Sequence, residues 1–573
     1  MDRTIPSPGN EEIALYTRTY YSLLRSSGEI QIRSLEETHA GMNSSLHLHA
    51  EDPIIDLGAF IYAYLRLPPV MDKVRLIVLG QTPEVFMRRG YPDIREWTPV
   101  QSPGRRRRAY FDGKETLAAQ IASVSDIDDL VPMLVALQIE WNKIHAHLAN
   151  TPAEDILRRH GDAGALPTPA EAEQVRLALE LSEADFARLY SLWGNEWPRH
   201  LLTIAQRRKS MSILLLAGSF VDYRKATEEW WREIERAAEG LGLNQRPVYF
   251  VSSNTHSIAN LLSGFAVTRE AEIAEYLRQE NPEGLWDEYR RLQQSGEPGL
   301  ENLLYYAYRL CASHPAYRHL RDAMRAWEEE CGILRIPAPA ALDVGAQVID
   351  LRRLRPERFD RRIQMPGLAR LAESSALIFN VDYPLGMAAY LILTQATANL
   401  GELRGFYAMG KAATLNGRVG DVMIPNVVYD EHSQNTFLFK NCFSAGDVAP
   451  YLLQGAVFDN QKAVTVRGTF LQNRDFMHVF YREGYTDIEM EAGPYLSAVY
   501  ENIYPKRYPI NEIVNLFINA WFDIGVIHYA SDTPYSRRQE LLSKSLSYFG
   551  VDATYAASVA IVRRILAREI GAR

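Results

Sequence analysis

The sequence contains few cysteines and no excess of basic residues. Its three cysteines, Cys311, Cys331 and Cys442, lie far apart and match no zinc-binding or redox spacing, so we expect reduced, structural thiols. The formal net charge of −9 argues against general nucleic-acid binding, because duplex recognition usually requires a clear basic excess. A small anion in a local basic pocket remains compatible with this charge.

Membrane and ATPase signatures are also lacking. Residues 1–6 do not combine a charged start with an apolar run, as a signal peptide does, and no apolar run reaches the ~18 residues of a membrane span. We therefore expect a cytoplasmic protein that contacts no membrane. A glycine-rich phosphate loop with a lysine is missing as well, so nothing supports an ATPase.

Length and composition indicate a globular protein with several domains. Hydrophobic residues make up 47% and charged residues 23% of the 573 positions, which suits three or four domains of ~150 residues or two larger ones. We expect a helical and α/β N-terminal region at 1–150, an Ala-, Pro- and Gly-rich connector at 152–173, an α/β region at 174–336 and a C-terminal domain at 342–573.

The middle region predicts a βαβ unit, with a strand at 213–217, a helix at 225–238 and a strand at 248–251. The second strand runs into the polar loop 252–257 at the start of a helix. Such a loop is either an anion site or a well-capped helix start, and the sequence leaves both open.

Two polar motifs of the N-terminal region have a structural alternative. Residues 105–108 are four arginines that could grip phosphates, but a short basic run beside Pro-Gly is more often a solvated loop. His47 and His49 could bind a metal, but without nearby acidic or cysteine ligands such a pair more often lies in an exposed loop or strand. We assign no function to either motif.

From residue 342 onward, strands and helices alternate, among them a strand expected at 376–381 and a helix at 387–397, which indicates a three-layer α/β domain. Within it, Glu489, Met490 and Glu491 stand where an apolar run enters a helix, and a later apolar strand ends on Ser531 and Asp532. Carboxylates that meet at the mouth of an apolar sheet can divide two tasks. One accepts hydrogen bonds from sugar hydroxyls, and another, with a raised pKa, protonates a leaving group. This is the chemistry of cleaving a ribosyl–base bond.

These motifs resemble those of the nucleoside phosphorylase and nucleosidase superfamily. The resemblance covers about residues 342–573 and includes, in order, the segments 410–415 and 419–424, the Glu-Met-Glu motif and the Ser-Asp pair. The Ser-Asp-Thr-Pro run and the long N-terminal extension are most similar to the AMP nucleosidase branch. The resemblance implies a phosphorylase/nucleosidase-like C-terminal domain behind a large, mostly helical α/β N-terminal region, a homo-oligomer, and no metal or other cofactor.

The resemblance also implies roles for single residues. Glu491 would bind the ribose hydroxyls, Met490 would pack on the sugar, and Asp532 would be the general acid at a purine ring nitrogen. Phe470, at the end of an expected strand at 464–470, would stack on the base. Each has a structural alternative: helix-start charges for Glu489 and Glu491, core packing for Met490 and Phe470, and a helix cap for Asp532.

The sequence departs from the phosphorylase pattern at the phosphate site. Ala408 and Lys411 stand where those enzymes carry an arginine before the loop residue Gly410 and a serine or threonine after it. Lys411 could hold a substrate phosphate or form a structural salt bridge. His432 either orients water or a carboxylate or is structural.

The hypothesis from sequence is therefore a nucleosidase that hydrolyses the N-glycosidic bond of a purine nucleotide or nucleoside. Two alternatives remain. One is a nucleoside phosphorylase that uses inorganic phosphate, and the other is a catalytically silent nucleotide sensor. Under the nucleosidase hypothesis, the N-terminal region would have a regulatory or substrate-capping role.

Overall fold

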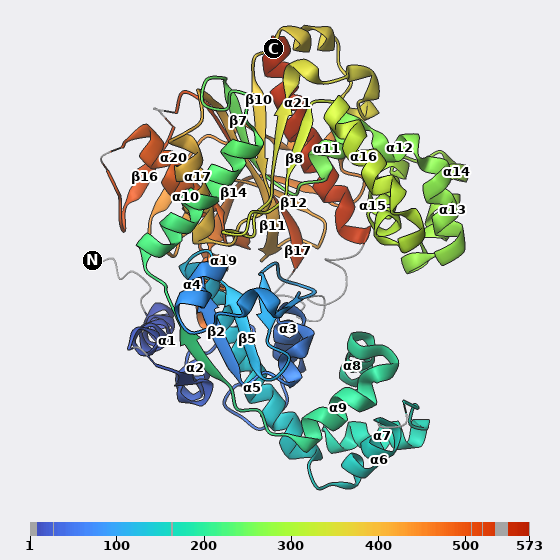
Figure 1. Cartoon of the computed structure of the whole chain (residues 1–573), viewed down its shortest axis with the longest axis vertical. Coiled ribbons are helices and arrows are strands. Elements are labelled where there is room, and N and C mark those ends of the chain that lie inside the picture. Colours follow the sequence, from blue (N-terminus) through green and yellow to red (C-terminus); the bar gives the residue numbers. More distant parts are fainter. Residues whose placement is uncertain are drawn as a thin grey trace. The chain divides into compact units, whose positions relative to one another are not determined.

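The computed structural model describes residues 8–26, 28–161, 164–505, 507–517, 520–532 and 548–571 (Figure 1). The chain forms two compact units. Unit 1 comprises Met1–Ala226 and Arg467–Arg482, and unit 2 comprises Thr227–Val466 and Glu483–Arg573. Within the described residues, no helix is both long enough and apolar enough to cross a membrane.

Unit 1 contains a six-stranded sheet with three parallel strands at its centre. The strand order is β1-β6-β2-β5-β4-β3, and β2 pairs in parallel with both β5 and β6. Strand β2 is buried because its sequence is continuously apolar, as the sequence predicts. The strands are β1 (Ile30–Gln31), β2 (Leu76–Gly80), β3 (Thr98–Val100), β4 (Ala109–Phe111), β5 (Thr116–Gln120) and β6 (Ser212–Leu215).

Helices surround this sheet, and the longest, α5, is buried along most of its length. Ser123 and Asp126 form a capping box at its start. The expected connector at 152–173 instead contains α6 and the start of α7, which Thr168 and Glu171 cap. The helices are α1 (Pro8–Arg25), α2 (Glu36–Gly41), α3 (Leu57–Arg66), α4 (Pro83–Arg88), α5 (Val124–Leu148), α6 (Pro152–Gly161), α7 (Pro169–Ala178), α8 (Glu183–Trp193), α9 (Trp197–Gln206) and α19 (Arg474–Arg482).

Unit 2 contains an eleven-stranded mixed sheet. Its order is β16-β13-β12-β14-β15-β11-β7-β10-β9-β8, and β17 pairs with β11 and β12. The strands are β7 (Val248–Ser252), β8 (Ile333–Ile336), β9 (Ala346–Asp350), β10 (Leu377–Val381), β11 (Leu403–Thr414), β12 (Val422–Asp430), β13 (Thr436–Leu438), β14 (Val457–Thr465), β15 (Asp487–Glu489), β16 (Ile513–Asn515) and β17 (Asp523–Asp532).

Helices α16, α20 and α21 of unit 2 contact this sheet, and α12–α15 pack against one another. Helix α21 contributes a long apolar face to the main core. The helices of unit 2 are α10 (Phe220–Ala237), α11 (Ser257–Ser263), α12 (Phe265–Thr268), α13 (Glu270–Glu280), α14 (Leu285–Ser295), α15 (Leu300–Ser313), α16 (His319–Glu330), α17 (Met387–Thr397), α18 (Ala445–Val448), α20 (Ala492–Ile503) and α21 (Val551–Ile570), with residues 220–226 of α10 belonging to unit 1.

The predicted βαβ unit is not formed. Its helix exists as α10, but β6 belongs to the sheet of unit 1 and β7 to the sheet of unit 2. In Figure 1 the green β7 lies beside β10, with which it pairs in parallel, and it also pairs with β11. Because β7 and β8 both precede residue 342, the boundary expected near residue 340 does not coincide with the division into units.

Five strands of unit 2 close into a ring. Strand β17 pairs with β11 on one side and β12 on the other, and β14 and β15 complete the circuit. Ala412, Met423 and Ala530 form a small apolar cluster separate from the main core. Alternate residues of a strand point to opposite faces. These three residues, and those an even number of positions away on the same strands, therefore face the inside of the ring.

Candidate functional site

The Glu-Met-Glu motif forms the connection between β15 and α20. Strand β15 ends on Glu489, and Glu491 is the N-cap residue of α20, so the predicted entry of an apolar run into a helix is confirmed. Met490 and Glu491 are half-buried, whereas Glu489 is only 4% exposed. The two carboxylates therefore stand in different environments.

Glu489 is bound on both of its oxygens. Its Oε2 accepts the backbone N–H groups of Glu491 and Ala492, both at 2.6 Å, and the hydroxyl of Thr465 donates to its Oε1. The same hydroxyl oxygen accepts the N–H of Gly493 at 2.8 Å. Burial raises the pKa of Glu489 above its ordinary value. His528 and the hydrogen-bond donors oppose this rise without cancelling it. Glu489 thus anchors the start of α20.

Glu491 does not cap its own helix with its side chain. Its Oε1 instead accepts the N–H of Gly386 at 3.2 Å, just before α17 begins. Of the two alternatives for the acidic pair, a helix-start role therefore fits Glu489, while Glu491 is directed toward the turn between β10 and α17.

A buried ion pair lies beside this motif. Nδ1 of His528, on β17, is 2.7 Å from Oδ2 of Asp487, on β15, and the two residues are 4% and 0% exposed. Burial alone would lower the pKa of His528, but Asp487, with Glu489 and Glu491, raises it above its ordinary value. Neither residue of this pair is among those predicted from the sequence. The sequence did contain a signal for a charged partner: Asp487 and Glu489 are two positions apart, which puts two carboxylates on one face of a strand.

Gly410 and Lys411 lie within a strand, not in the expected loop, because β11 continues to Thr414. Gly410 is the register partner of His528, and a Cβ atom at Gly410 would meet no atom within 4 Å. Open space therefore adjoins this part of β11. Lys411 is exposed, whereas Ala408 is buried.

Ser531 and Asp532 end strand β17. The hydroxyl of Ser531 donates to the carbonyl of Ala412 at 3.4 Å, and the backbone of Asp532 is in register with Ala413. The side chain of Asp532 and residues 533–547 lie outside the described part of the chain.

His432 follows β12 in a turn organised by Asp430. The Asp430 carboxylate accepts the N–H groups of His432 and Ser433, and its Oδ1 is 3.8 Å from Nδ1 of His432. Asp430 also packs against Gly493 in the first turn of α20. The structure therefore brings the turn that carries His432 next to the helix that follows Glu491.

Phe470 belongs to unit 1, because β14 ends at Thr465 and the segment 467–482 joins that unit. Its ring is buried, with its centroid 5.4 Å from that of Tyr62 in an edge-to-face contact and 6.3 Å from that of His47. The structure thus corrects the expected strand 464–470 and supports the alternative of core packing for Phe470.

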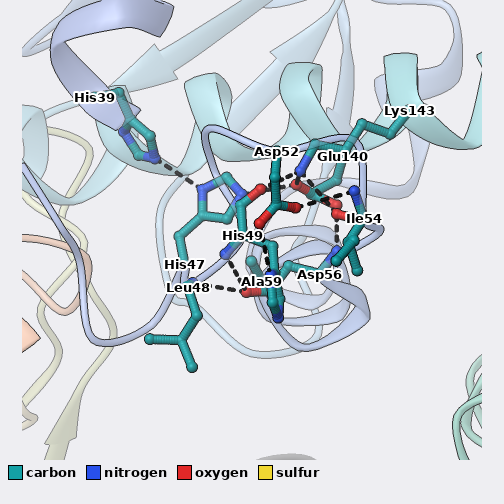
Figure 2. A network of polar contacts seen from close by, with 10 residues as sticks. All are labelled: His39, His47, Leu48, His49, Asp52, Ile54, Asp56, Ala59, Glu140 and Lys143. Atoms are coloured by element: carbon teal, nitrogen blue, oxygen red, sulfur yellow. Dashed lines mark hydrogen bonds and ion pairs between the residues drawn. The ribbon is translucent and has the colours of Figure 1, made fainter. Parts of the chain in front are cut away.

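Unit 1 contains a second polar network, which Figure 2 shows. His47, expected in an exposed position, is buried: its Nδ1 is 2.9 Å from Nε2 of His39 and its Nε2 is 2.8 Å from Oε1 of Glu140. Glu140 also accepts the N–H of Asp56 and pairs with Lys143. Burial and the neighbouring His47 lower the pKa of His39 well below its ordinary value. The network fixes the segment 47–56 against α5.

The other polar motifs are largely satisfied within the protein. Arg107 is buried and pairs with Asp126 and Asp129, so the arginine run is not simply a solvated loop. In the loop 252–257, the side chain of Asn254 accepts two backbone N–H groups at the start of α11, which favours a capped helix. Within the described residues, no group of three or more His, Cys, Asp and Glu side chains is arranged to hold a metal ion.

A pocket of about 530 Å³ lies in unit 1, against α2 and α5. Its lining carries both signs of charge, with Glu36, Glu37 and Glu51 opposed by Lys143 and Arg208. The acidic motif and its histidine partner belong to unit 2, so the pocket is not part of that site.

Residues 32–567 match the model of a protein family described as a family of unknown function (DUF6909), and the chain belongs to this family. No curated protein sequence matches the chain. Similar solved structures include isoform 2 of uridine phosphorylase from Schistosoma mansoni in complex with citrate, with 10% identity, 59% of this chain and 91% of that chain covered, and a TM-score of 0.30. Another is 5′-methylthioadenosine/S-adenosylhomocysteine nucleosidase from Neisseria meningitidis in complex with methylthio-immucillin-A, with 11% identity, coverage of 56% and 99%, and a TM-score of 0.29.

Proposed function

We propose that unit 2 hydrolyses the N-glycosidic bond of a purine nucleoside or nucleotide. The observation that carries the proposal is the different use of the two motif carboxylates. Glu489 is buried and holds the N–H of Glu491, while Glu491 is half-buried and does not cap α20. Because Glu489 holds the backbone of Glu491, the Glu491 carboxylate is pre-organised to accept hydrogen bonds from sugar hydroxyls.

The reaction passes through a transition state with positive charge on the ribose. The bond between the anomeric carbon and the purine nitrogen breaks first, and the electron pair leaves with the base. The carboxylate of Glu491 binds the ribose hydroxyls and stabilises the developing charge, while Met490 packs on the sugar. Asp532 gives its proton to the departing purine. Water then forms the new bond to the anomeric carbon and releases a proton, which restores the acid.

The surroundings of β11 support a pentose site at this end of the ring. Gly410 leaves open space beside His528, and Lys411 follows it on the same strand, exposed on the opposite face. In the proposed enzyme, the long side chain of Lys411 would reach around the end of the ring to contact the phosphate of a nucleotide substrate as a point charge. Because Ala408 takes the place of an arginine, this site offers less binding to a nucleophilic inorganic phosphate than a phosphorylase needs.

The first test is the release of free base from a panel of nucleosides and nucleotides, measured by chromatography with and without inorganic phosphate. We expect purine release that does not depend on phosphate. The Asp532→Asn and Glu491→Gln variants should lose most of this activity, while Glu483→Gln, which changes an exposed carboxylate, should retain it.

Three results would contradict the proposal. Phosphate-dependent release would identify a phosphorylase, and binding without release would identify a nucleotide sensor. Full activity of Asp532→Asn would remove the assigned general acid.

A further inference from the structure

Three acidic residues fall within five positions at the end of β15. Asp487 and Glu489 point to the same face of the strand because they are two residues apart, and both are buried. Two carboxylates buried side by side are strongly unfavourable unless a cation or several donors compensate them. Glu489 has its donors, but Oδ1 of Asp487 has no hydrogen-bond partner among the described residues. Asp487 therefore depends on a neighbouring positive charge.

His528 supplies that charge from the opposite side of the ring. It lies between Gly410 on β11 and Met423 on β12, which are its register partners and carry no charge. The charged groups that act on it most strongly are the carboxylates of Asp487, Glu489 and Glu491. Lys411 is exposed and adjacent in register to Tyr529, so it lies on the other face of the sheet. Asp430 is at the far end of β12.

We propose that His528 is a positioning residue of the base-releasing site, whose positive charge holds the Glu489–Glu491 turn in the shape that presents Glu491 to the sugar. His528 does not touch the reacting atoms in this scheme. It acts through Asp487 at 2.7 Å and through Glu489, whose oxygens fasten the N–H groups of Glu491 and Ala492. The kinetic part of this inference rests on the proposed N-glycosidic hydrolysis.

Loss of the proton from His528 would undo this arrangement. Without the imidazolium, the two buried carboxylates would face each other uncompensated. The cluster would then admit water to solvate the two carboxylates, and this change weakens the two backbone hydrogen bonds that Glu489 accepts. Because the pKa of His528 is raised, the positioned form persists to a higher pH than an ordinary histidine would allow, and it is lost as the pH rises through that pKa.

The experiment combines nuclear magnetic resonance with kinetics on the full chain. Histidine labelled at Cε1 reports the titration of His528, assigned by His528→Asn, and the amide resonance of Ala492 reports the helix start. We expect a His528 midpoint above its ordinary value, with the Ala492 amide shifting at the same pH. In Asp487→Asn both midpoints should fall by about one to three pH units, as for the loss of a neighbouring opposite charge.

The kinetic arm follows base release as a function of pH. The alkaline decline of kcat/KM in the wild type should have the His528 midpoint, and Asp487→Asn should move it to lower pH by the same amount. His528→Asn should lower kcat/KM on the order of 10²-fold, as expected for a misplaced binding group. Glu483→Gln is the matched control and should change neither profile.

Each outcome is decisive. A His528 midpoint below that of ordinary histidine, or an Ala492 amide that does not follow it, would overturn the inference even if the buried variants fail to fold, because both are measured on the wild type. The inference would also be overturned if, in Asp487→Asn, the alkaline decline of kcat/KM stays at the wild-type pH while the His528 midpoint moves. If the wild type releases no base, the proposed function fails, yet the coupling of His528 to Ala492 is still tested.

Discussion

The carboxylate of Glu489 accepts the backbone N–H of Glu491 at 2.6 Å, so the first acidic residue of the motif positions the second. The same oxygen accepts the N–H of Ala492, and the hydroxyl of Thr465 holds the other oxygen. Residues that look equivalent in the sequence thus have different surroundings: Glu489 anchors the start of α20, whereas Glu491 is the residue that, in the proposed function, binds the sugar.

Replacing the two glutamates by glutamine should have opposite effects. Glu489→Gln turns one acceptor oxygen into a donor facing other donors, so we expect a loss of about 1–3 kcal/mol of unfolding free energy. Glu491→Gln should leave stability nearly unchanged and remove most base release. Urea unfolding and chromatography on both variants check this. Equal destabilisation by the two variants would contradict the division of roles.

Thr465 should be sensitive to loss of its hydroxyl and insensitive to loss of its methyl group. Thr465→Val leaves Oε1 of Glu489 and the N–H of Gly493 without these hydrogen-bond partners in a buried place, which should cost about 1–3 kcal/mol. Thr465→Ser retains the hydroxyl and serves as the control. A serine variant as unstable as the valine variant would show that packing, and not this hydrogen bond, determines the effect.

Two glycines of unit 2 should respond differently to an added methyl group. A Cβ at Gly493 would lie 2.5 Å from the Cβ of Asp430, so Gly493→Ala should destabilise unit 2 by roughly 1–3 kcal/mol. Gly410→Ala meets open space and should fold normally. If sugar binds beside β11, Gly410→Ala should still raise KM. Melting temperatures and base-release kinetics decide between these outcomes, and a neutral Gly493→Ala would contradict the packing described.

Lys411→Ala tests the contact with a substrate phosphate. Hydrogen bonds to charged groups contribute about 1.5–3 kcal/mol, so kcat/KM for nucleotides should fall by roughly 10- to 100-fold while that for nucleosides stays similar. Lys440→Ala, at another exposed lysine of unit 2, is the control. An equal loss for both substrate classes would reject the phosphate contact.

Unit 1 should lose stability in mild acid because of His39. Its folded-state pKa lies well below the ordinary value near 6.5, so below that pH the unfolded chain binds a proton that the folded unit does not. The free energy of unfolding should therefore fall with decreasing pH, by up to ~1.4 kcal/mol per pH unit for this one group. Hydrogen exchange of α2 between pH 5 and 8 measures it. His39→Gln should show a smaller slope, and an unchanged slope would exclude His39 as the cause.

Local elements of the fold could be predicted where the sequence signal is local. Helix α17 spans the predicted 387–397, and β10 lies within the predicted strand 376–381, because apolar periodicity and flanking Gly and Pro depend on neighbouring residues. Prediction failed for Phe470, since nothing near it in sequence reveals that the segment 467–482 packs in unit 1. The strand predicted at 248–251 is confirmed as β7, but its expected pairing in a βαβ unit is wrong for the same reason, because both partner strands come from the C-terminal half.

The sequence by itself determined the chemistry available at the site: two glutamates at the entry to a helix, and a Ser-Asp pair at the end of an apolar strand. Only the tertiary structure decided that Glu489 is buried as an anchor, that Glu491 turns toward Gly386, and that His528 faces Asp487. The last two residues are 41 positions apart, and they meet because β17 closes the ring with β11 and β12. Strand pairing over such distances follows from the packing of the whole sheet, which no local pattern of residues encodes.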